Sequence, residues 1–173
     1  MTPDMQRAKR PVSRVIAGTY GHPYHPALVT VPIGAWSASL IFDVASRLVS
    51  KPAFLTTGSR WLIVIGIAGA IVASIAGFID LASLPEGTAV YRTACAHMAI
   101  NVGLIFAYVG DFEWHERVRT GPVSAGMLAL SGACIVLLAV SGFLGGRLAY
   151  RYGVRVADEA TQAAGYHVGR HNA

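Results

Sequence analysis

Charged side chains are scarce in this sequence, at 13% of 173 residues, whereas a soluble domain usually carries about 25%. Hydrophobic residues make up 54% of the chain, and the mean hydropathy is +0.50. This composition excludes an ordinary soluble enzyme and a disordered chain. There are only two cysteines, Cys95 and Cys134, and both lie in apolar runs. Their number and spacing exclude a disulfide framework and a spaced zinc motif.

Recognisable catalytic motifs are also missing. The sequence contains no Walker-type phosphate loop and no GxSxG, HExxH or CxxC pattern. The net charge of +5 would suggest nucleic acid as a partner of a soluble chain, but here the basic residues gather at the ends of apolar segments, as in membrane proteins. We therefore expect no nucleic-acid partner, and the sequence favours a non-enzymatic function.

What the sequence does contain is four long apolar segments, at residues 26–46, 61–79, 93–110 and 121–146. A helix of about 20 residues crosses the hydrocarbon core of a bilayer, where the backbone can bond only to itself. The predicted fold class is therefore all-α: an integral membrane four-helix bundle. The connections are short, the third being residues 111–120, so successive helices are expected to be antiparallel in an up-down-up-down order.

The basic residues predict the orientation of this bundle. Nine lie in the N-terminal segment, the second connection and the C-terminal region, and five lie in the first and third connections. Because cytoplasmic segments are enriched in lysine and arginine, both termini are predicted to be cytoplasmic. We divide the chain into a basic cytoplasmic segment at 1–20, a transmembrane domain at 21–156 and a flexible cytoplasmic tail at 157–173. No cleavable signal sequence is expected.

Small residues indicate which helix faces pack against protein. A stripe in the second segment repeats at steps of three and four residues, which allows two helix backbones to approach closely. Asp80 continues this stripe and is therefore expected on the packed side. Weaker pairs of small residues with GxxxG-type spacing occur in the first and fourth segments. The helix-packing positions predicted in this way are Gly34, Gly66, Ala73, Gly77, Gly142 and Gly146.

Polar residues inside the third segment form the centre of the candidate site. His97, Asn101, Leu104 and Tyr108 share one helix face. An ionisable residue inside a membrane is a functional candidate, and Asp80 is expected at the same depth, where it would pair with His97. The alternative is a structural role, in which a neutral His97 bonds to a helix carbonyl, to Asn101 or to Asp80.

A second polar element precedes the first segment, in the run GHPYHPALVTVPIG at residues 21–34. Pro26 suits the first turn of a helix, whereas Pro32 lacks a backbone donor and would kink or unwind the chain there. His22 and His25 lie beside this irregular start, and at least one is predicted to approach the polar residues of the third segment. Alternatively, both only cap the chain and anchor it at the interface. The complete predicted cluster is His22, His25, Asp80, His97 and Asn101.

Three stretches carry a family resemblance: HPALVTVPIG at 25–34, GFIDLASLPEGTAVYRTACAHMAIN at 77–101 and GGRLAYRYGVRV at 145–156. They look like an uncharacterised bacterial family of four-helix membrane proteins with a domain-of-unknown-function label, some fused to or encoded beside Rieske-type iron–sulphur domains. The resemblance covers about residues 21–156 and implies a multi-pass protein of the bacterial cytoplasmic (inner) membrane, but no established activity. This chain lacks the Cys/His pairs of a Rieske domain, so such a partner would be a separate protein.

Three functions remain open at this point. The first is a non-enzymatic accessory or anchor subunit of a membrane redox system, with the lipid bilayer and a Rieske-type or other redox protein as partners. The second is a haem b or metal-binding electron carrier that uses His97 and either His25 or His22 as ligands; the cofactor is otherwise unknown. The third is a proton or small-solute pathway through Asp80, His97 and Asn101, which would require a homo-oligomer because four helices enclose little space.

Overall fold

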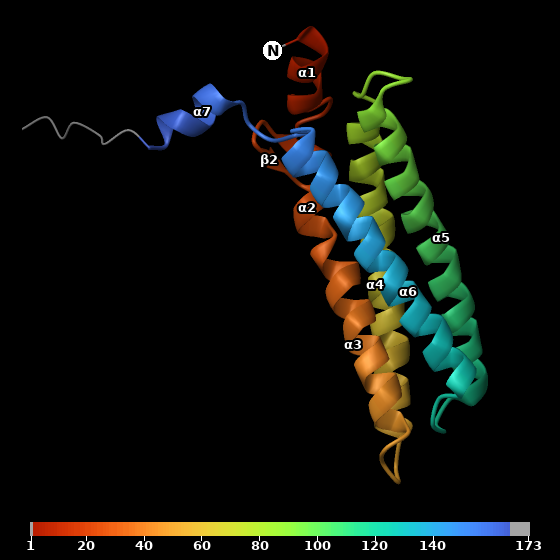
Figure 1. The fold of residues 1–173 in the computed structure, drawn as a ribbon. Coiled ribbons are helices and arrows are strands. Elements are labelled where there is room, and N and C mark those ends of the chain that lie inside the picture. Colours follow the sequence, from red (N-terminus) through yellow and green to blue (C-terminus); the bar gives the residue numbers. More distant parts are fainter. Residues whose placement is uncertain (1, 167–173) are drawn as a thin grey trace, which may run out of the picture.

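The computed structural model describes residues 2–166, and four long helical rods dominate it (Figure 1). The first rod consists of α2 (His25–Leu28) and α3 (Thr30–Ser46), and the next two are α4 (Ala53–Leu81) and α5 (Ala89–Val118). The fourth is α6 (Ala125–Gly146), which continues into a π-helical turn, η1 (Arg147–Arg151). The smaller elements are α1 (Pro3–Lys9), β1 (Gly18–Thr19), β2 (His22–Pro23) and α7 (Glu159–Ala164). Residues 167–173 of the predicted tail lie outside the described residues.

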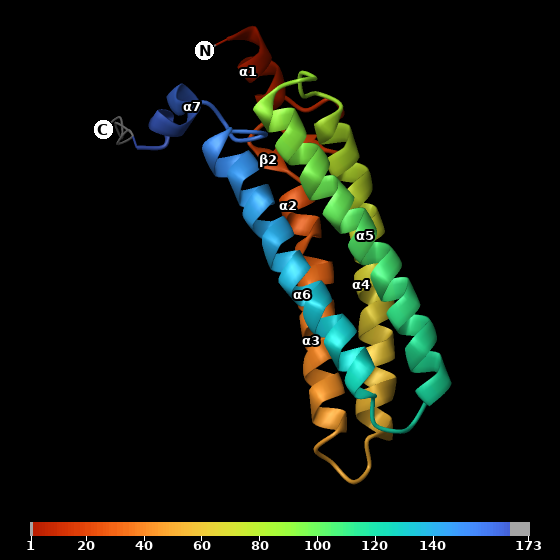
Figure 2. The ribbon, with the colours of Figure 1, turned by 45° about the vertical axis from the view of Figure 1, so that its right-hand side comes forward.

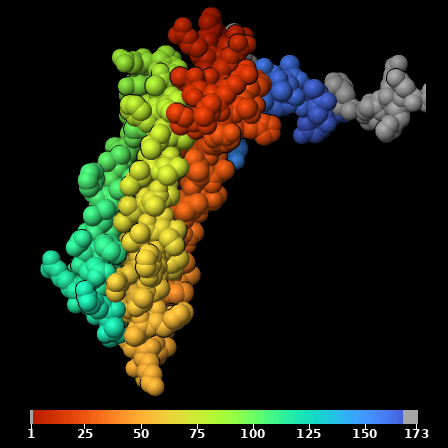
Figure 3. All heavy atoms as spheres, turned by 180° about the vertical axis from the view of Figure 1, so that it is seen from behind, coloured from red at the N-terminus to blue at the C-terminus, as the bar shows by residue number. Residues whose placement is uncertain are grey.

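The rods form a closed bundle in which sequence neighbours are antiparallel. Both α3 and α5 pack against α4 and α6, so α3 and α5 lie diagonally across the bundle. The α3–α4 and α5–α6 connections lie at one end, which we call the loop end (Figure 2). The α4–α5 connection, α1 and the β1–β2 hairpin lie at the other, which we call the cap end, and α7 stands off from it to one side (Figure 3).

Each of the four rods is long and apolar enough to cross a membrane. The candidate spans are His25–Ser46, Ala53–Leu81, Ala89–Val118 and Ala125–Arg151. The predicted fold class, an up-down-up-down membrane bundle of four helices, is therefore confirmed. The placement of both termini in the cytoplasm stays a prediction.

Many small and polar side chains are buried inside this bundle, and many large apolar ones lie on its outer surface. Outside positions carry Ile41, Phe54, Trp61, Phe78, Phe106 and Phe143, each more than half exposed. Fully buried inside are the hydroxyl side chains of Ser39, Ser46, Thr56, Ser59 and Ser131. Lipid tails solvate the outer side chains, while small inner residues let the helices approach and bond to one another.

The middle of the bundle is apolar. Trp36 of α3 stacks on Tyr108 of α5, with ring centroids 4.0 Å apart and an interplanar angle of 12°. Gly66 of α4 makes room for this stack, because an added Cβ would overlap the indole of Trp36. Ile63 and Leu104, both fully buried, complete the layer.

The first rod is interrupted at Val29, between α2 and α3. Pro32 has no N–H to donate to the carbonyl of Leu28, so one helical bond is missing there. The hydroxyl of Thr30 adds a bond to the neighbouring carbonyl of Ala27 at 2.6 Å. The irregular start predicted from Pro32 is thus confirmed. The segment packs against α4, so protein covers the irregular backbone.

Two helices extend beyond the apolar segments from which they were predicted. α4 already begins at Ala53, and α5 continues to Val118, through most of the stretch predicted as the third connection. These turns stay helical because their charged residues find partners in the bundle. Arg60 of α4 forms an ion pair with Glu116 of α5, and Asp111 is fully buried. Hydropathy alone therefore predicted the start of α4 too late in the sequence and the end of α5 too early.

The predicted helix-packing positions in α4 differ from those in the other rods. In α4, Gly66 and Gly77 receive aromatic rings from the first rod, and Ala73 is buried. The three predicted positions outside α4 are Gly34, Gly142 and Gly146. An added Cβ at these three would meet either no atom within 4 Å or only a side chain of its own rod. Within residues 2–166, these positions therefore do not mark a close contact between two rods.

Candidate functional site

Four fully buried polar side chains meet near the loop end. We call them the carboxylate–imidazole cluster: Asp43 from α3, Asp111 and His115 from α5, and Ser131 from α6. Nε2 of His115 lies 3.0 Å from Oδ1 of Asp43. Nδ1 of the same ring lies 2.9 Å from the backbone carbonyl oxygen of Asp111 and 3.4 Å from its Oδ1. Ser131 donates its hydroxyl to Oδ2 of Asp111 at 3.0 Å, so the cluster joins three helices.

The hydrogen bonds of the imidazole determine where its protons lie. A backbone carbonyl only accepts, so Nδ1 of His115 carries a proton. On the opposite side, Nε2 and Oδ1 of Asp43 form a hydrogen bond only when one proton lies between them. The pair is therefore either an imidazolium facing an ionised Asp43 or a neutral imidazole facing a protonated Asp43. In both states one proton is shared.

Two carboxylate oxygens of the cluster accept no hydrogen bond. Oδ2 of Asp43 and Oδ1 of Asp111 are buried without a hydrogen-bonding partner among the described residues, as is the hydroxyl of Tyr108 nearby on α5. Two ionised carboxylates and one imidazolium would give the cluster a net charge of −1. An uncompensated charge is unfavourable in so apolar an environment. One further proton on either free carboxylate oxygen makes the cluster neutral.

The cluster lies inside the span but close to the loop end. Asp111 precedes the end of α5 by seven residues, or about 10 Å at a rise of 1.5 Å per residue. The hydroxyl of Ser46, one turn beyond Asp43, accepts the N–H of Val123 at 3.2 Å. Thr56 donates its hydroxyl to the carbonyl of Gly121 at 2.8 Å. These bonds fix the α5–α6 connection over the cluster.

Two residues of the predicted site, His25 and His97, meet near the cap end. Their ring centroids are 6.0 Å apart, and the rings are nearly perpendicular at 83°. Nδ1 of His25 lies 2.8 Å from the carbonyl oxygen of Ala73. The ring lies over Gly77, where an added Cβ would be 3.0 Å away. This contact fixes the short helix α2 to α4.

Both ring nitrogens of His97 already have protein partners. Nδ1 lies 2.9 Å from the carbonyl oxygen and 3.0 Å from the hydroxyl of Ser141, and Nε2 lies 3.2 Å from the side-chain amide of Asn101. A haem or metal ligand needs a free ring nitrogen. Across residues 2–166, no three His, Cys, Asp or Glu side chains are grouped in a way that would hold a metal ion. The His25–His97 pair therefore does not fit a haem b or metal centre, and the contacts of His97 match the structural alternative.

Asp80 does not form the predicted pair with His97, and of the two histidines before the first rod, at least one of which was predicted to approach, His25 is the one that reaches His97. Oδ1 of Asp80 forms an ion pair with Nε of Arg155 at 2.9 Å, instead of pairing with His97. The chain beyond η1 turns back to the end of α4 and brings this guanidinium to the carboxylate. His22 is exposed in β2, and its Nδ1 lies 3.4 Å from the carbonyl oxygen of Tyr20.

Arg155, which the sequence analysis did not single out, holds the cap together. Its side chain donates to the carbonyls of Ala17 at 2.7 Å and Gly18 at 3.2 Å, and its backbone N–H donates to the carbonyl of Ala8 at 2.9 Å. The residue is 3% exposed and has a φ of +60°, in the left-handed region. One buried arginine thus connects α4 with the N-terminal segment. No spacing in the sequence identifies it.

The carboxylate–imidazole cluster was also missed, although the sequence carried a signal for it. The polar face recognised on the third segment continues at the same spacing of three and four residues beyond the last apolar residue. Assigning residues 111–120 to a connection ended the pattern too early. From His97 onward, the polar and buried positions of this face are His97, Asn101, Leu104, Tyr108, Asp111 and His115.

The fold and the inward polar groups define an integral membrane protein of the four-helix class. A family model described as "Predicted membrane protein (DUF2231)" matches residues 21–158, and the chain belongs to this family of membrane proteins of unknown function. The match includes all four spans and Arg155. Searches of curated proteins and of solved structures found no match to the chain.

Proposed function

We propose that this protein is a proton-binding membrane subunit, in which the carboxylate–imidazole cluster takes up and releases a proton within the bundle. The observation that carries the proposal is the meeting of Asp43, Asp111 and His115 at hydrogen-bonding and ion-pair distances, with no exposed surface on any of them. Ionisable groups inside membranes are commonly members of proton relays. The proposal replaces a pathway through Asp80 and His97, whose partners are Arg155, Ser141 and Asn101.

Charge supports reversible binding at this site. With one proton shared and one on a free carboxylate oxygen, the cluster is neutral and suits its apolar surroundings. Loss of the second proton leaves a charge of −1, which the hydroxyl of Ser131 stabilises only in part. The two charge states therefore differ by one proton on Oδ2 of Asp43 or Oδ1 of Asp111, the two carboxylate oxygens that accept no hydrogen bond.

The surroundings favour exchange with the loop end only. On that side, the path from the cluster to the surface passes the polar hydroxyls of Ser46 and Thr56 and the α5–α6 connection. On the other side lies the layer of Trp36, Ile63 and Leu104, which is apolar except for the buried hydroxyl of Tyr108. We therefore propose a proton-binding site open to one face of the membrane, and not a route across it.

Infrared spectroscopy of the purified protein in lipid tests this proposal, because a protonated carboxyl group and a carboxylate absorb differently. We expect the wild type to lose one carboxylic carbonyl band reversibly as the pH rises. Asp43→Asn and Asp111→Asn should each remove or shift this band. Asp158→Asn, a matched change in the cap, should leave it unchanged. If no such band titrates while the amide bands show a folded protein, the cluster is only a structural contact and the proposal fails.

An accessory or anchor role in a membrane redox system is a second proposal. The ordered cap, which Arg155 fixes to α4, supports it because a docking surface must be held in one shape. A Rieske-type partner rests on the family resemblance alone. Respiration of membranes that contain the wild type, Arg155→Ala or no copy of the chain tests the role. Equal quinol-dependent oxygen consumption in all three would contradict it.

A further inference from the structure

A basic cavity in the cap has no part in the proposed proton chemistry. It has a volume of about 580 Å³ and lies among the end of α1, the β1–β2 hairpin and Asp158. Small-molecule sites usually have volumes of roughly 300–1,000 Å³. Three cationic side chains, Lys9, Arg10 and Arg14, and one carboxylate, Asp158, line it, which gives a net charge of +2.

The carboxylate of Asp158 is already bonded to other groups. Its Oδ2 accepts the hydroxyl of Tyr20 at 2.9 Å, and its Oδ1 accepts the N–H of Thr161 at 2.8 Å. Lys9 is only 9% exposed, and its Nζ donates to the carbonyls of Val156 at 3.3 Å and Ala157 at 3.5 Å. These neutral carbonyls orient the ammonium group, and the nearby carboxylate of Asp158 offsets part of its charge. A fixed, buried positive charge therefore forms one wall of the cavity.

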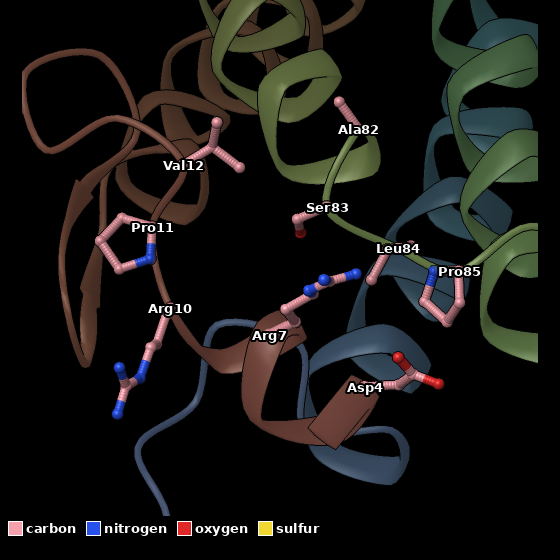
Figure 4. Close-up of a pocket in the computed structure, with 9 residues that line it drawn as sticks. All are labelled: Asp4, Arg7, Arg10, Pro11, Val12, Ala82, Ser83, Leu84 and Pro85. Atoms are coloured by element: carbon pink, nitrogen blue, oxygen red, sulfur yellow. The ribbon is translucent and has the colours of Figure 1, made fainter. Parts of the chain in front are cut away.

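Arg10 and Arg14 supply the exposed positive charges of the cavity. Both are exposed, and neither forms an ion pair within residues 2–166. A smaller cavity of about 380 Å³ lies on the other side of Arg10, between α1 and the end of α4. In it, the side chain of Arg7 extends toward Leu84, whereas that of Arg10 points away from the end of α4 (Figure 4). The guanidinium group of Arg10 is therefore available for a ligand in the larger cavity.

We propose that the 580 Å³ cavity binds a phosphate group, carried either by an anionic phospholipid or by a water-soluble phosphate ester. Arginine guanidinium groups match phosphate oxygens in geometry and charge, and a buried lysine adds a fixed positive charge. The position suits a headgroup: α4, with 29 residues, is about 43 Å long, so its ends project beyond a hydrocarbon core of about 30 Å. Basic pockets at such positions bind anionic lipid headgroups.

Native mass spectrometry of the full-length protein in detergent tests the site. The probes are phosphatidylglycerol, phosphatidylcholine and glycerol phosphate. The variant Arg10→Gln/Arg14→Gln removes the two exposed charges and keeps buried Lys9 in place. We expect it to weaken phosphatidylglycerol binding about 25-fold, or about fivefold for each charge. Arg92→Gln is the matched control for a single charge, because Arg92 is at the same end but outside the cavity.

Three outcomes decide the matter. Binding of phosphatidylglycerol that depends on Arg10 and Arg14, with no binding of glycerol phosphate, supports a lipid headgroup as the source of the phosphate. Arginine-dependent binding of glycerol phosphate as well supports a soluble ester. If the wild type does not distinguish phosphatidylglycerol from phosphatidylcholine, or if the double variant binds no more weakly than Arg92→Gln, the proposal is overturned.

Discussion

His115 and Asp43 form a contact of 3.0 Å between Nε2 and Oδ1 across the diagonal of the bundle. Their helices, α5 and α3, are separated on either side by α4 and α6. The Trp36–Tyr108 stack crosses the same diagonal nearer the middle. The polar contact therefore fixes the distance between two helices that the short connections do not join directly. It also places a shared proton near the bundle axis.

Removing one partner of this pair should destabilise the bundle. Asp43→Ala leaves Nε2 of His115 buried without a partner, and breaking a buried pair in this way costs about 3–5 kcal/mol. Ile41→Ala, two residues away on the outer face of the same helix, is the control because Ile41 is 65% exposed. We expect a much lower unfolding midpoint in detergent for Asp43→Ala than for Ile41→Ala. Equal midpoints would show that the pair does not stabilise the fold.

Two glycines in long helices should respond differently to the same substitution. A Cβ at Gly77 would lie 3.0 Å from the ring of His25, whereas one at Gly103 would meet no atom within 4 Å. Gly77→Ala should therefore lower stability by about 1–3 kcal/mol through overpacking. Gly103→Ala should leave it unchanged or slightly higher. Thermal unfolding in detergent compares the two, and a tolerated Gly77→Ala would contradict the His25 contact.

The cap should loosen when Arg155 is replaced by lysine. Arg155→Lys keeps the charge near Asp80 but loses the planar group that also reaches the carbonyls of Ala17 and Gly18. Amide hydrogen exchange should become faster in residues 8–18 and stay slow in the middle of α4. Arg151→Lys, an exposed change at the end of η1, is the control. Unchanged exchange in residues 8–18 would show that Arg155 does not hold the cap.

The contact between Asp158 and α7 should persist to unusually low pH. Hydrogen bonds from the N–H of Thr161 and the hydroxyl of Tyr20 lower the pKa of Asp158 below its ordinary value of 3.8. A lowered pKa means that the stabilisation is complete above the ordinary value and disappears as the pH falls through the lower one. The NMR shift of the Thr161 amide should therefore titrate below pH 3.8. A midpoint at or above that value, or an unchanged titration in Asp158→Asn, would contradict these bonds.

The predicted orientation can be tested with two introduced cysteines. Ser50 lies in the exposed α3–α4 connection and Thr161 in exposed α7, at opposite ends of the molecule. In a background without Cys95 and Cys134, Ser50→Cys should react with an impermeant thiol reagent in intact cells. Thr161→Cys should react only after the cells are opened. The reverse pattern would place the termini outside the cytoplasm.

The sequence predicted the fold better than the site, for a physical reason. Lipid requires long apolar helices, so hydropathy alone predicts the four spans and their order. The same criterion ends a segment at its first charges and so removed Asp111 and His115 from α5, where their buried partners keep them helical. The small-residue stripe predicted that Asp80 faces the packed side of its helix. Its partner there, Arg155, lies in the non-helical segment after η1, so no helical spacing in the sequence predicts the contact.

Carbon-13 NMR of aspartate-labelled protein in lipid tests the central claim most directly, with Asp43→Asn and Asp111→Asn used to assign the carboxyl signals of Asp43 and Asp111. The account predicts that one of these two signals shifts reversibly with pH between a protonated and an ionised state while the protein remains folded, because the two charge states differ by one proton on a carboxylate oxygen that accepts no hydrogen bond. Replacing either residue should alter that shift. If both carboxyl signals stay constant at every pH at which the bundle is folded, the cluster does not exchange a proton, and the proposed function is wrong.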